Sequence, residues 1–306
     1  MRLLPLLLLL VVLPCQAKEI ATDPQCVALG KRLAKQLYPH ALPGKYENSW
    51  PHHERYDPEL DLDDLNRLVQ CKAMPDDDAK LIMLLPVAPL WETTNPRNDE
   101  EESACCDVDI LVLAKSNAQI IARMHEHVPV DLAGSAGAGD GWVAGGDGWS
   151  IVGYTIDTAR YNLTRNTRAF GIRVDYEPAT AHRAFDRLQS LSLYIAEAGS
   201  IRQILSLLEV AHNDGMPTFE EDVCEPTTRY MQRTLSMAST AAHGYFDLTV
   251  HESFVGARTA GDTTKEPCDT KTSETKRLFT LHFDGTQYRV PSQFRVFATP
   301  NSGTPH

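Results

Sequence analysis

The sequence of 306 residues lacks any apolar run long enough to cross a bilayer as a helix, which takes roughly 20 residues. The run at residues 3–13 is too short, and nothing later in the chain is long enough either. This run follows the basic residue Arg2 and precedes small residues up to Ala17, a pattern typical of a secretory signal peptide. We therefore expect export, cleavage after Ala17 and no membrane span. Lipidation at Cys15 is the alternative, which Pro14 disfavours.

Basic residues are scarce relative to acidic ones. The chain has 29 Lys and Arg against 41 Asp and Glu, which gives a formal net charge of −12. Proteins that bind nucleic acids concentrate Lys and Arg on one face to neutralise phosphates, so the composition argues against a nucleic-acid partner. It argues equally against an anionic membrane surface. An acidic exported protein is suited to cationic partners, although acidity also serves solubility.

Motifs of the common catalytic classes are also absent. Ser150 follows a glycine-rich turn but enters a predicted strand, so the chain has no G-x-S-x-G nucleophile elbow. It has no P-loop or dinucleotide-binding motif, because the β-α-β frame for those glycines is missing. His251 begins HESF without the second histidine of a metalloprotease helix, and His125 and His127 are too few for a zinc site. The sequence assigns no catalytic residue.

Cysteine is present in a number that indicates a disulfide framework. Six cysteines remain after the predicted cleavage, and an even number is typical of proteins from an oxidising compartment. They are Cys26, Cys71, Cys105, Cys106, Cys224 and Cys268. We predict that Cys26 pairs with Cys71 and joins two N-terminal helices. We also predict a bond between Cys224 and Cys268. The adjacent pair at 105–106 either forms a strained bond between neighbours or crosses to the other cysteines, which would change the map.

Helical periodicity is confined to the N-terminal region. Cys26, Leu29, Leu33 and Leu37 recur at helical spacing, and residues 61–71 (DLDDLNRLVQC) are a second amphipathic candidate. From about residue 78 onward, short β-branched or aromatic segments separated by turn residues predict strands instead. We therefore expect a signal peptide at residues 1–17, a helical cap with a loop at 18–75 and an antiparallel β domain at 76–306.

Alternation of side chains indicates strands with one buried and one solvated face. The apolar residues at 170, 172, 174 and 176 alternate with polar ones, and residues 246–251 repeat the pattern. Turn residues predict hairpins around residues 116–117, 198–199 and 284–285. The last is Asp-Gly, which supplies the positive φ angles of a two-residue loop. The predicted fold is mainly β: an antiparallel sandwich, barrel or propeller-like meander with a short N-terminal helical segment.

Two acidic stretches are candidate calcium sites. Asp107 and Asp109 precede an apolar strand and share one strand face, where their carboxylates would offer the oxygen ligands that Ca²⁺ prefers. Asp140 and Asp147 lie in GDGWVAGGDGW (139–149), whose glycines suit a calcium loop. The stretch at 98–109 contains no glycine to turn the backbone, and a solvated acidic loop is the alternative.

The same glycine-rich stretch carries two tryptophans, Trp142 and Trp149, and predicts a loop between strands. Exposed tryptophan in a loop often marks a binding surface. The alternative is a loop that packs back onto the sheet. We take Trp142, Trp149, Asp140 and Asp147 as the candidate binding residues.

Three segments resemble a group of exported, β-rich proteobacterial proteins: DVDILVLAKSNAQIIARM (107–124), IDTARYNLTRNTRAFGIRVDY (156–176) and LHFDGTQYRVP (281–291). The Asp-x-Asp pair before an apolar strand and the terminal F-D-G-x-x-Y hairpin are more weakly similar to periplasmic immunity proteins that inhibit secreted lysozyme-like toxins. Some of those proteins bind calcium. The resemblance implies a periplasmic binding protein with a protein partner and no catalytic residue. An envelope hydrolase and a structural or assembly factor of the envelope are the alternatives.

Overall fold

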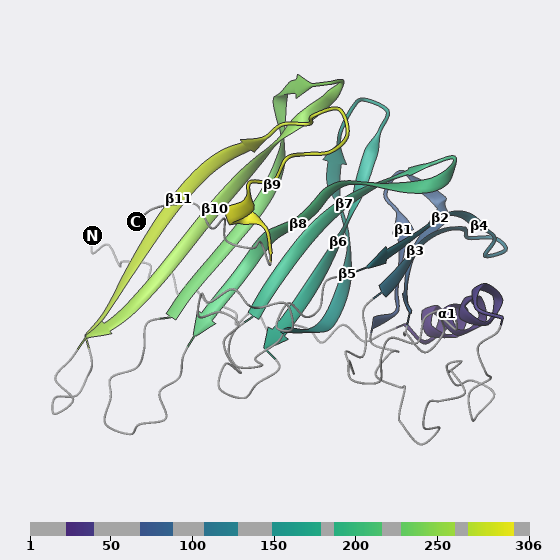
Figure 1. The fold of residues 1–306 in the computed structure, drawn as a ribbon, viewed down its shortest axis with the longest axis horizontal. Coiled ribbons are helices and arrows are strands. Elements are labelled where there is room, and N and C mark those ends of the chain that lie inside the picture. Colours follow the sequence, from purple (N-terminus) through teal and green to yellow (C-terminus); the bar gives the residue numbers. More distant parts are fainter. Residues whose placement is uncertain are drawn as a thin grey trace, which may run out of the picture.

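The computed structural model describes residues 23–39, 68–87, 107–127, 149–178, 187–215, 228–260 and 269–296. Within these ranges, one α-helix accompanies eleven strands that all belong to one sheet (Figure 1). The helix is α1 (Pro24–Leu37). The strands are β1 (Gln70–Met74), β2 (Asp77–Val87), β3 (Asp107–Ala114), β4 (Ile120–His127), β5 (Trp149–Asn162), β6 (Arg168–Pro178), β7 (Arg187–Glu197), β8 (Gly199–Gly215), β9 (Thr228–Ala242), β10 (Tyr245–Ala260) and β11 (Asp269–Leu281).

The strand order is β1-β2-β3-β4-β8-β7-β6-β5, and β9, β10 and β11 continue from β8. The start of β8 pairs in parallel with β4, and its end pairs with β9. Every other pairing is antiparallel, as predicted. The two ends of the path approach each other, because Lys72 of β1 donates a hydrogen bond to the Ile156 carbonyl of β5 at 3.0 Å. Since no ladder joins β1 to β5 within the described ranges, the sheet is folded on itself without closing into a barrel.

Apolar side chains form three buried clusters, two between the layers of this folded sheet and one beneath α1. The first lies between β2–β4 and β5–β8, and the second between β5–β8 and β10–β11 with the C-terminal segment. The third lies between α1 and β2–β3. Strand β2 contributes Ile82 and Leu84 to the first cluster, and Met83 and Leu85 to the third. Because both faces of β2 and β3 are buried, their sequences are continuously apolar rather than alternating.

Helix α1 is fixed at its start by a side-chain cap and to the sheet by a disulfide. Asp23 accepts a hydrogen bond from the Gln25 backbone N–H at 2.9 Å, which satisfies one of the free donors of the first turn. Cys26 is bonded to Cys71, which confirms the predicted pairing. The prediction that this bond joins two helices is wrong, because Cys71 lies in β1. Residues 70–73 pair with β2, so the helix predicted over residues 61–71 does not extend through Cys71, while residues 61–67 lie outside the described ranges.

The predicted strand segments all overlap strands of the sheet, and the predicted hairpins form. Strands β3–β4 and β7–β8 pair antiparallel, and Phe283 bridges Tyr288. The third turn is longer than the predicted two-residue loop, because residues 284–287 lie between the bridged pair, and Gly285 but not Asp284 has a positive φ. The sequence did not predict β1 or β9. The predicted domain boundary between residues 75 and 76 falls inside the turn that joins the paired strands β1 and β2.

The C-terminal segment, residues 282–296, lies across β8 and covers the second cluster (Figure 1). Tyr288 N donates to the Ile204 carbonyl at 2.7 Å, and Val296 N donates to the Leu207 carbonyl at 3.0 Å. A short 3-10 helix, η3 (Ser292–Phe294), places the Phe294 ring 4.8 Å from the guanidinium of Arg233 in β9. The segment therefore ties the central strands to the β9–β11 end of the sheet.

Candidate functional site

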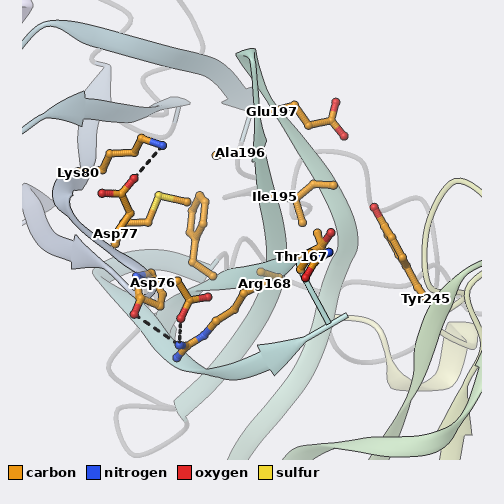
Figure 2. A pocket seen from close by; sticks show the side chains of 14 residues that line it. Asp76, Asp77, Lys80, Thr167, Arg168, Ile195, Ala196, Glu197 and Tyr245 are labelled. Atoms are coloured by element: carbon orange, nitrogen blue, oxygen red, sulfur yellow. Dashed lines mark hydrogen bonds and ion pairs between the residues drawn. The ribbon is translucent and has the colours of Figure 1, made fainter. Parts of the chain in front are cut away.

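Four segments of the sheet converge on a pocket of about 330 Å³ (Figure 2). They are the β1–β2 turn with the start of β2, the β5–β6 turn with the start of β6, the end of β7, and the start of β10. A pocket of this size is at the lower end of the range for small-ligand sites, and it fits one long side chain of a partner.

The β1–β2 turn places an ion pair at the pocket. Residue 74 pairs with Asp77 whereas residue 73 pairs with residue 81, so residues 78–80 form a bulge at the start of β2. Asp77 accepts a hydrogen bond from the Ala79 backbone N–H at 3.1 Å and lies 3.0 Å from the Lys80 ammonium. The hydrogen bond from Lys80 holds the pKa of Asp77 below its ordinary value. Asp77 is therefore ionised at neutral pH.

Arg168, the first residue of β6, connects three segments beside this turn. A second bulge, residues 158–160 of β5, presents two backbone carbonyls to Arg168, which donates to Thr158 O at 2.9 Å and to Ala159 O at 3.3 Å. The same guanidinium donates to Asp76 at 2.6 Å. The arginine side chain is 17% exposed and the aspartate side chain is 61% exposed. Arg168 is thus an anchored cation, and Asp76 is the solvent-facing carboxylate that it positions.

The opposite wall carries Glu197 and Tyr245, and Arg202 holds both. Arg202 donates to the Glu197 carboxylate at 3.1 Å and to the Tyr245 hydroxyl at 3.3 Å. Tyr245 follows the β9–β10 turn, in which His243 and Gly244 have φ angles of 49° and 87°. Positive φ at both central positions is typical of a two-residue type I′ turn, which brings Tyr245 back beside the end of β7.

The pocket combines an apolar lining with a charged rim (Figure 2). Met74, Phe170 and Ile195 supply apolar surface. The charged lining residues are three acids and two bases: Asp76, Asp77, Glu197, Lys80 and Arg168. Such a site suits a group with an apolar stem and a cationic head, because the stem contacts the lining while the head approaches the carboxylates.

The predicted calcium ligand Asp109 is fully buried and its carboxylate already has partners. It accepts hydrogen bonds from the Tyr38 hydroxyl at 2.7 Å and from Arg123 at 2.9 and 3.1 Å. Its other contact is His125 Nδ1, at 3.2 Å. A calcium ion bound to Asp109 would therefore have to displace Arg123 or Tyr38. This arrangement ties α1 to the β3–β4 hairpin.

The strand register brings the two acidic residues of the predicted calcium site beside two histidines. Asp107 lies opposite His127, and Asp109 lies opposite His125, so these four positions share one face of the β3–β4 hairpin. The side chains of Asp107 and His127 are outside the described part of the structure. Among the side chains that are described, no three from His, Cys, Asp and Glu form a group that could hold a metal ion.

A second polar cluster lies where β4 meets β7 and β8. The carboxylate of Glu126 accepts hydrogen bonds from the Tyr194 hydroxyl and, at 2.8 Å, from the Gln203 side chain. Burial raises the pKa of Glu126 above its ordinary value, and these two hydrogen bonds only partly offset that effect. Burial and the nearby Glu126 carboxylate raise the pKa of the Tyr194 hydroxyl well above its ordinary value.

Several predicted site residues lie outside the described ranges. They are Asp140, Asp147, Trp142, Cys105, Cys106, Cys224 and Cys268. Trp149 is the first residue of β5, but its side chain is not among those described. The roles predicted for these residues stay predictions.

The pocket residues were not singled out from the sequence. The stretch MPDDDAK (74–80) carries a signal, because Pro and Asp between apolar segments mark a turn and concentrate acids there. Nothing local indicates that Arg168 or Tyr245 joins that turn, since their proximity depends on the order of strands in the sheet.

No helix in the described ranges is both long enough and apolar enough to cross a membrane. No protein-family model, curated protein or solved structure matches the chain.

Proposed function

We propose that the protein is an exported binding protein of the periplasm that captures and inhibits a basic, cell-wall-directed hydrolase of the lysozyme type. The pocket described above receives a lysine or arginine side chain of that partner. The observation that carries the proposal is the joint presence, in one pocket, of an apolar lining and exposed carboxylates on anchored turns.

The net charge of the protein supports a cationic partner at long range, and the carboxylates of the pocket support one at close range. The formal net charge of −12 attracts a basic protein over long range, which raises the rate of encounter. At the pocket, Asp76 and Asp77 are 61% and 40% exposed, so they can approach a partner's cation while they keep their own ion pairs. Arg168 holds Asp76 in place before binding, which reduces the entropy lost on association.

The first test measures binding and inhibition with a panel of basic lysozyme-type hydrolases. Calorimetry gives the affinity of the purified, oxidised protein for each hydrolase, and the clearing of a peptidoglycan suspension gives inhibition. We expect at least one hydrolase to be bound and inhibited, with an affinity that falls as salt is raised, because salt screens exposed charges. Hydrolysis of peptidoglycan by the protein itself would instead support the envelope-hydrolase alternative.

The second test uses neighbouring aspartates as site variant and control. Asp77→Asn removes a pocket charge but keeps the side-chain oxygen that accepts from Ala79 N–H, so the turn should persist. Asp78→Asn removes the same charge from an exposed residue that does not line the pocket. We expect Asp77→Asn to weaken binding roughly threefold to tenfold and Asp78→Asn to have a smaller effect. Equal effects of the two substitutions on affinity would mean that the pocket does not bind the partner. No binding to any member of the panel would contradict the proposed function.

A further inference from the structure

In the described part of the chain, β11 is an edge strand. It pairs with β10 alone, from Leu281 opposite Leu248 to Asp269 opposite Ala260. The side chains of residues 272–278 are exposed, and that of Leu278 is 68% exposed. Figure 1 shows β11 at the end of the molecule far from α1, where it follows the long β10 strand. The unpaired N–H and C=O groups on such an edge can bond a further strand.

One face of β11 carries charges of both signs, which could pair with those of an identical strand running antiparallel to it. Glu274, Lys276 and Leu278 share a face because side chains alternate along a strand. The Glu274 carboxylate and the Lys276 ammonium lie 3.0 Å apart, and their side chains are 50% and 74% exposed. A hollow of about 430 Å³, lined by Lys276, Leu278 and His251 of β10 among others, continues this face onto the sheet.

We propose that β11 forms the interface of a symmetric dimer, in which it pairs antiparallel with β11 of a second copy of this chain and Thr275 lies opposite Thr275. Glu274 of each copy then lies opposite Lys276 of the other, and the reverse pair repeats across the two-fold axis. Both copies use the same surface, as an isologous interface requires. The two sheets join into one, with roughly one backbone hydrogen bond for each opposed residue pair.

The charges select this register over its neighbours. Centring the two-fold axis on Glu274 would place two carboxylates opposite each other, and centring it on Lys276 would place two ammonium groups opposite each other. Like charges in directly opposed positions destabilise a strand pair, whereas opposite charges stabilise it. Lysines on an edge strand usually prevent indiscriminate pairing. In β11, of the three registers compared, the pairing centred on Thr275 is the one that places Glu274 of each copy opposite Lys276 of the other and so neutralises both charges.

Sedimentation velocity over a concentration series tests the dimer directly. We expect a concentration-dependent dimer for the oxidised wild-type protein. Glu274→Lys places two cations opposite each other at both contacts, and Lys276→Glu places two anions there. Each variant alone should dimerise roughly tenfold more weakly than the wild type. An equimolar mixture of the two variants should form a heterodimer of near wild-type affinity, because every Lys then faces a Glu.

The mixture also separates an interface effect from misfolding, since mixing does not rescue a variant that fails to fold. Lys115→Glu, an exposed charge reversal in the turn between β3 and β4, is the matched control and should leave the dimer unchanged. A wild-type protein that stays monomeric throughout the series would overturn the proposal. So would a dimer that both single variants retain, or a mixture that associates no better than its components. This test is independent of whether the pocket binds a hydrolase.

Discussion

Gly171 in β6 occupies a position where a larger side chain would crowd its neighbours. A Cβ atom built there would lie 2.8 Å from Leu191 Cδ1 and 3.1 Å from Asp157 Cβ. These distances are shorter than normal contacts, and Gly171 is itself buried. The sequence alone gives no sign of this constraint, because glycine in a strand more often indicates weak pairing than close packing.

We predict that Gly171→Ala lowers the free energy of unfolding by about 1–3 kcal/mol, the usual cost of overpacking a core. Gly153→Ala is the matched control on the neighbouring strand, because its Cβ would meet only Asp175 Oδ2 at 3.7 Å, an ordinary contact. Urea unfolding followed by circular dichroism measures both variants. Equal midpoints for the two variants would mean that Leu191 and Asp157 do not constrain residue 171.

Glu126 offers a pH-dependent test of the second polar cluster. Burial raises its folded-state pKa above the ordinary value of 4.5, so the native state favours the neutral carboxyl. The wild-type protein therefore loses stability as the pH rises from the ordinary pKa through the raised one. Glu126→Gln is neutral at every pH and can still bond Tyr194 and Gln203. We predict that the stability of the variant relative to the wild type increases over that interval and is constant above it.

Thermal unfolding of both proteins between pH 4 and pH 8 measures this difference. Parallel pH profiles would show that Glu126 is not held in an environment that disfavours its charge.

The pKa of Asp157 is shifted in the opposite direction from that of Glu126. Burial raises its pKa, but hydrogen bonds from Ala159 N–H, Tyr161 and Arg173 outweigh burial and lower the pKa below the ordinary value. Its contribution to stability is therefore lost at acidic pH in both proteins and cancels in the comparison.

Among the elements, α1 depends most clearly on a covalent bond. The Cys26–Cys71 disulfide spans 45 residues of sequence and ties the helix to β1. Closing a loop of that length in the unfolded chain accounts for about 4 kcal/mol of stability in the chain-entropy estimate. We predict that the double variant Cys26→Ala, Cys71→Ala unfolds with a free energy about 2–4 kcal/mol below that of the wild type.

Alanine at both positions avoids burying an unpaired thiol or hydroxyl in the cluster beneath α1. Denaturant unfolding gives the free energy, and peptide mapping without reductant checks the link between residues 26 and 71. A loss below about 0.5 kcal/mol would show that the bond does not constrain the unfolded chain as the loop length requires.

Strands whose sequences alternate or run continuously apolar were predictable, and the two without such patterns were not. Residues 170–176 alternate because one face of β6 lies on the first buried cluster. Strand β1 (QCKAM) has little β propensity and is a strand because β2 pairs with it. In strand β9, the buried Arg233 lies on the same face as Met231 and Leu235 and interrupts their apolar pattern, so only the pairing with β8 and β10 shows which side faces the interior.

At the scale of the whole molecule, the pocket depends on strand order. Asp76 and Arg168 are 92 residues apart in the sequence, and Lys72 and Ile156 are 84 residues apart, yet each pair is hydrogen-bonded. The fold class was predictable because it follows from local periodicity. The pocket was not, since it forms only after β1 folds back toward β5 and the β9–β10 hairpin lies beside β7. Long-range pairing of this kind carries no local sequence signal.

Hydrogen–deuterium exchange of the protein, alone and saturated with the hydrolase that it binds most tightly, tests the central claim most directly. The account predicts that backbone exchange slows on binding in residues 74–80, 164–170 and 195–198, the segments that surround the pocket. Strand β11 should exchange equally in both samples, because its proposed partner is a second copy of the chain. Unchanged exchange around the pocket, with protection confined to other segments, would contradict the account.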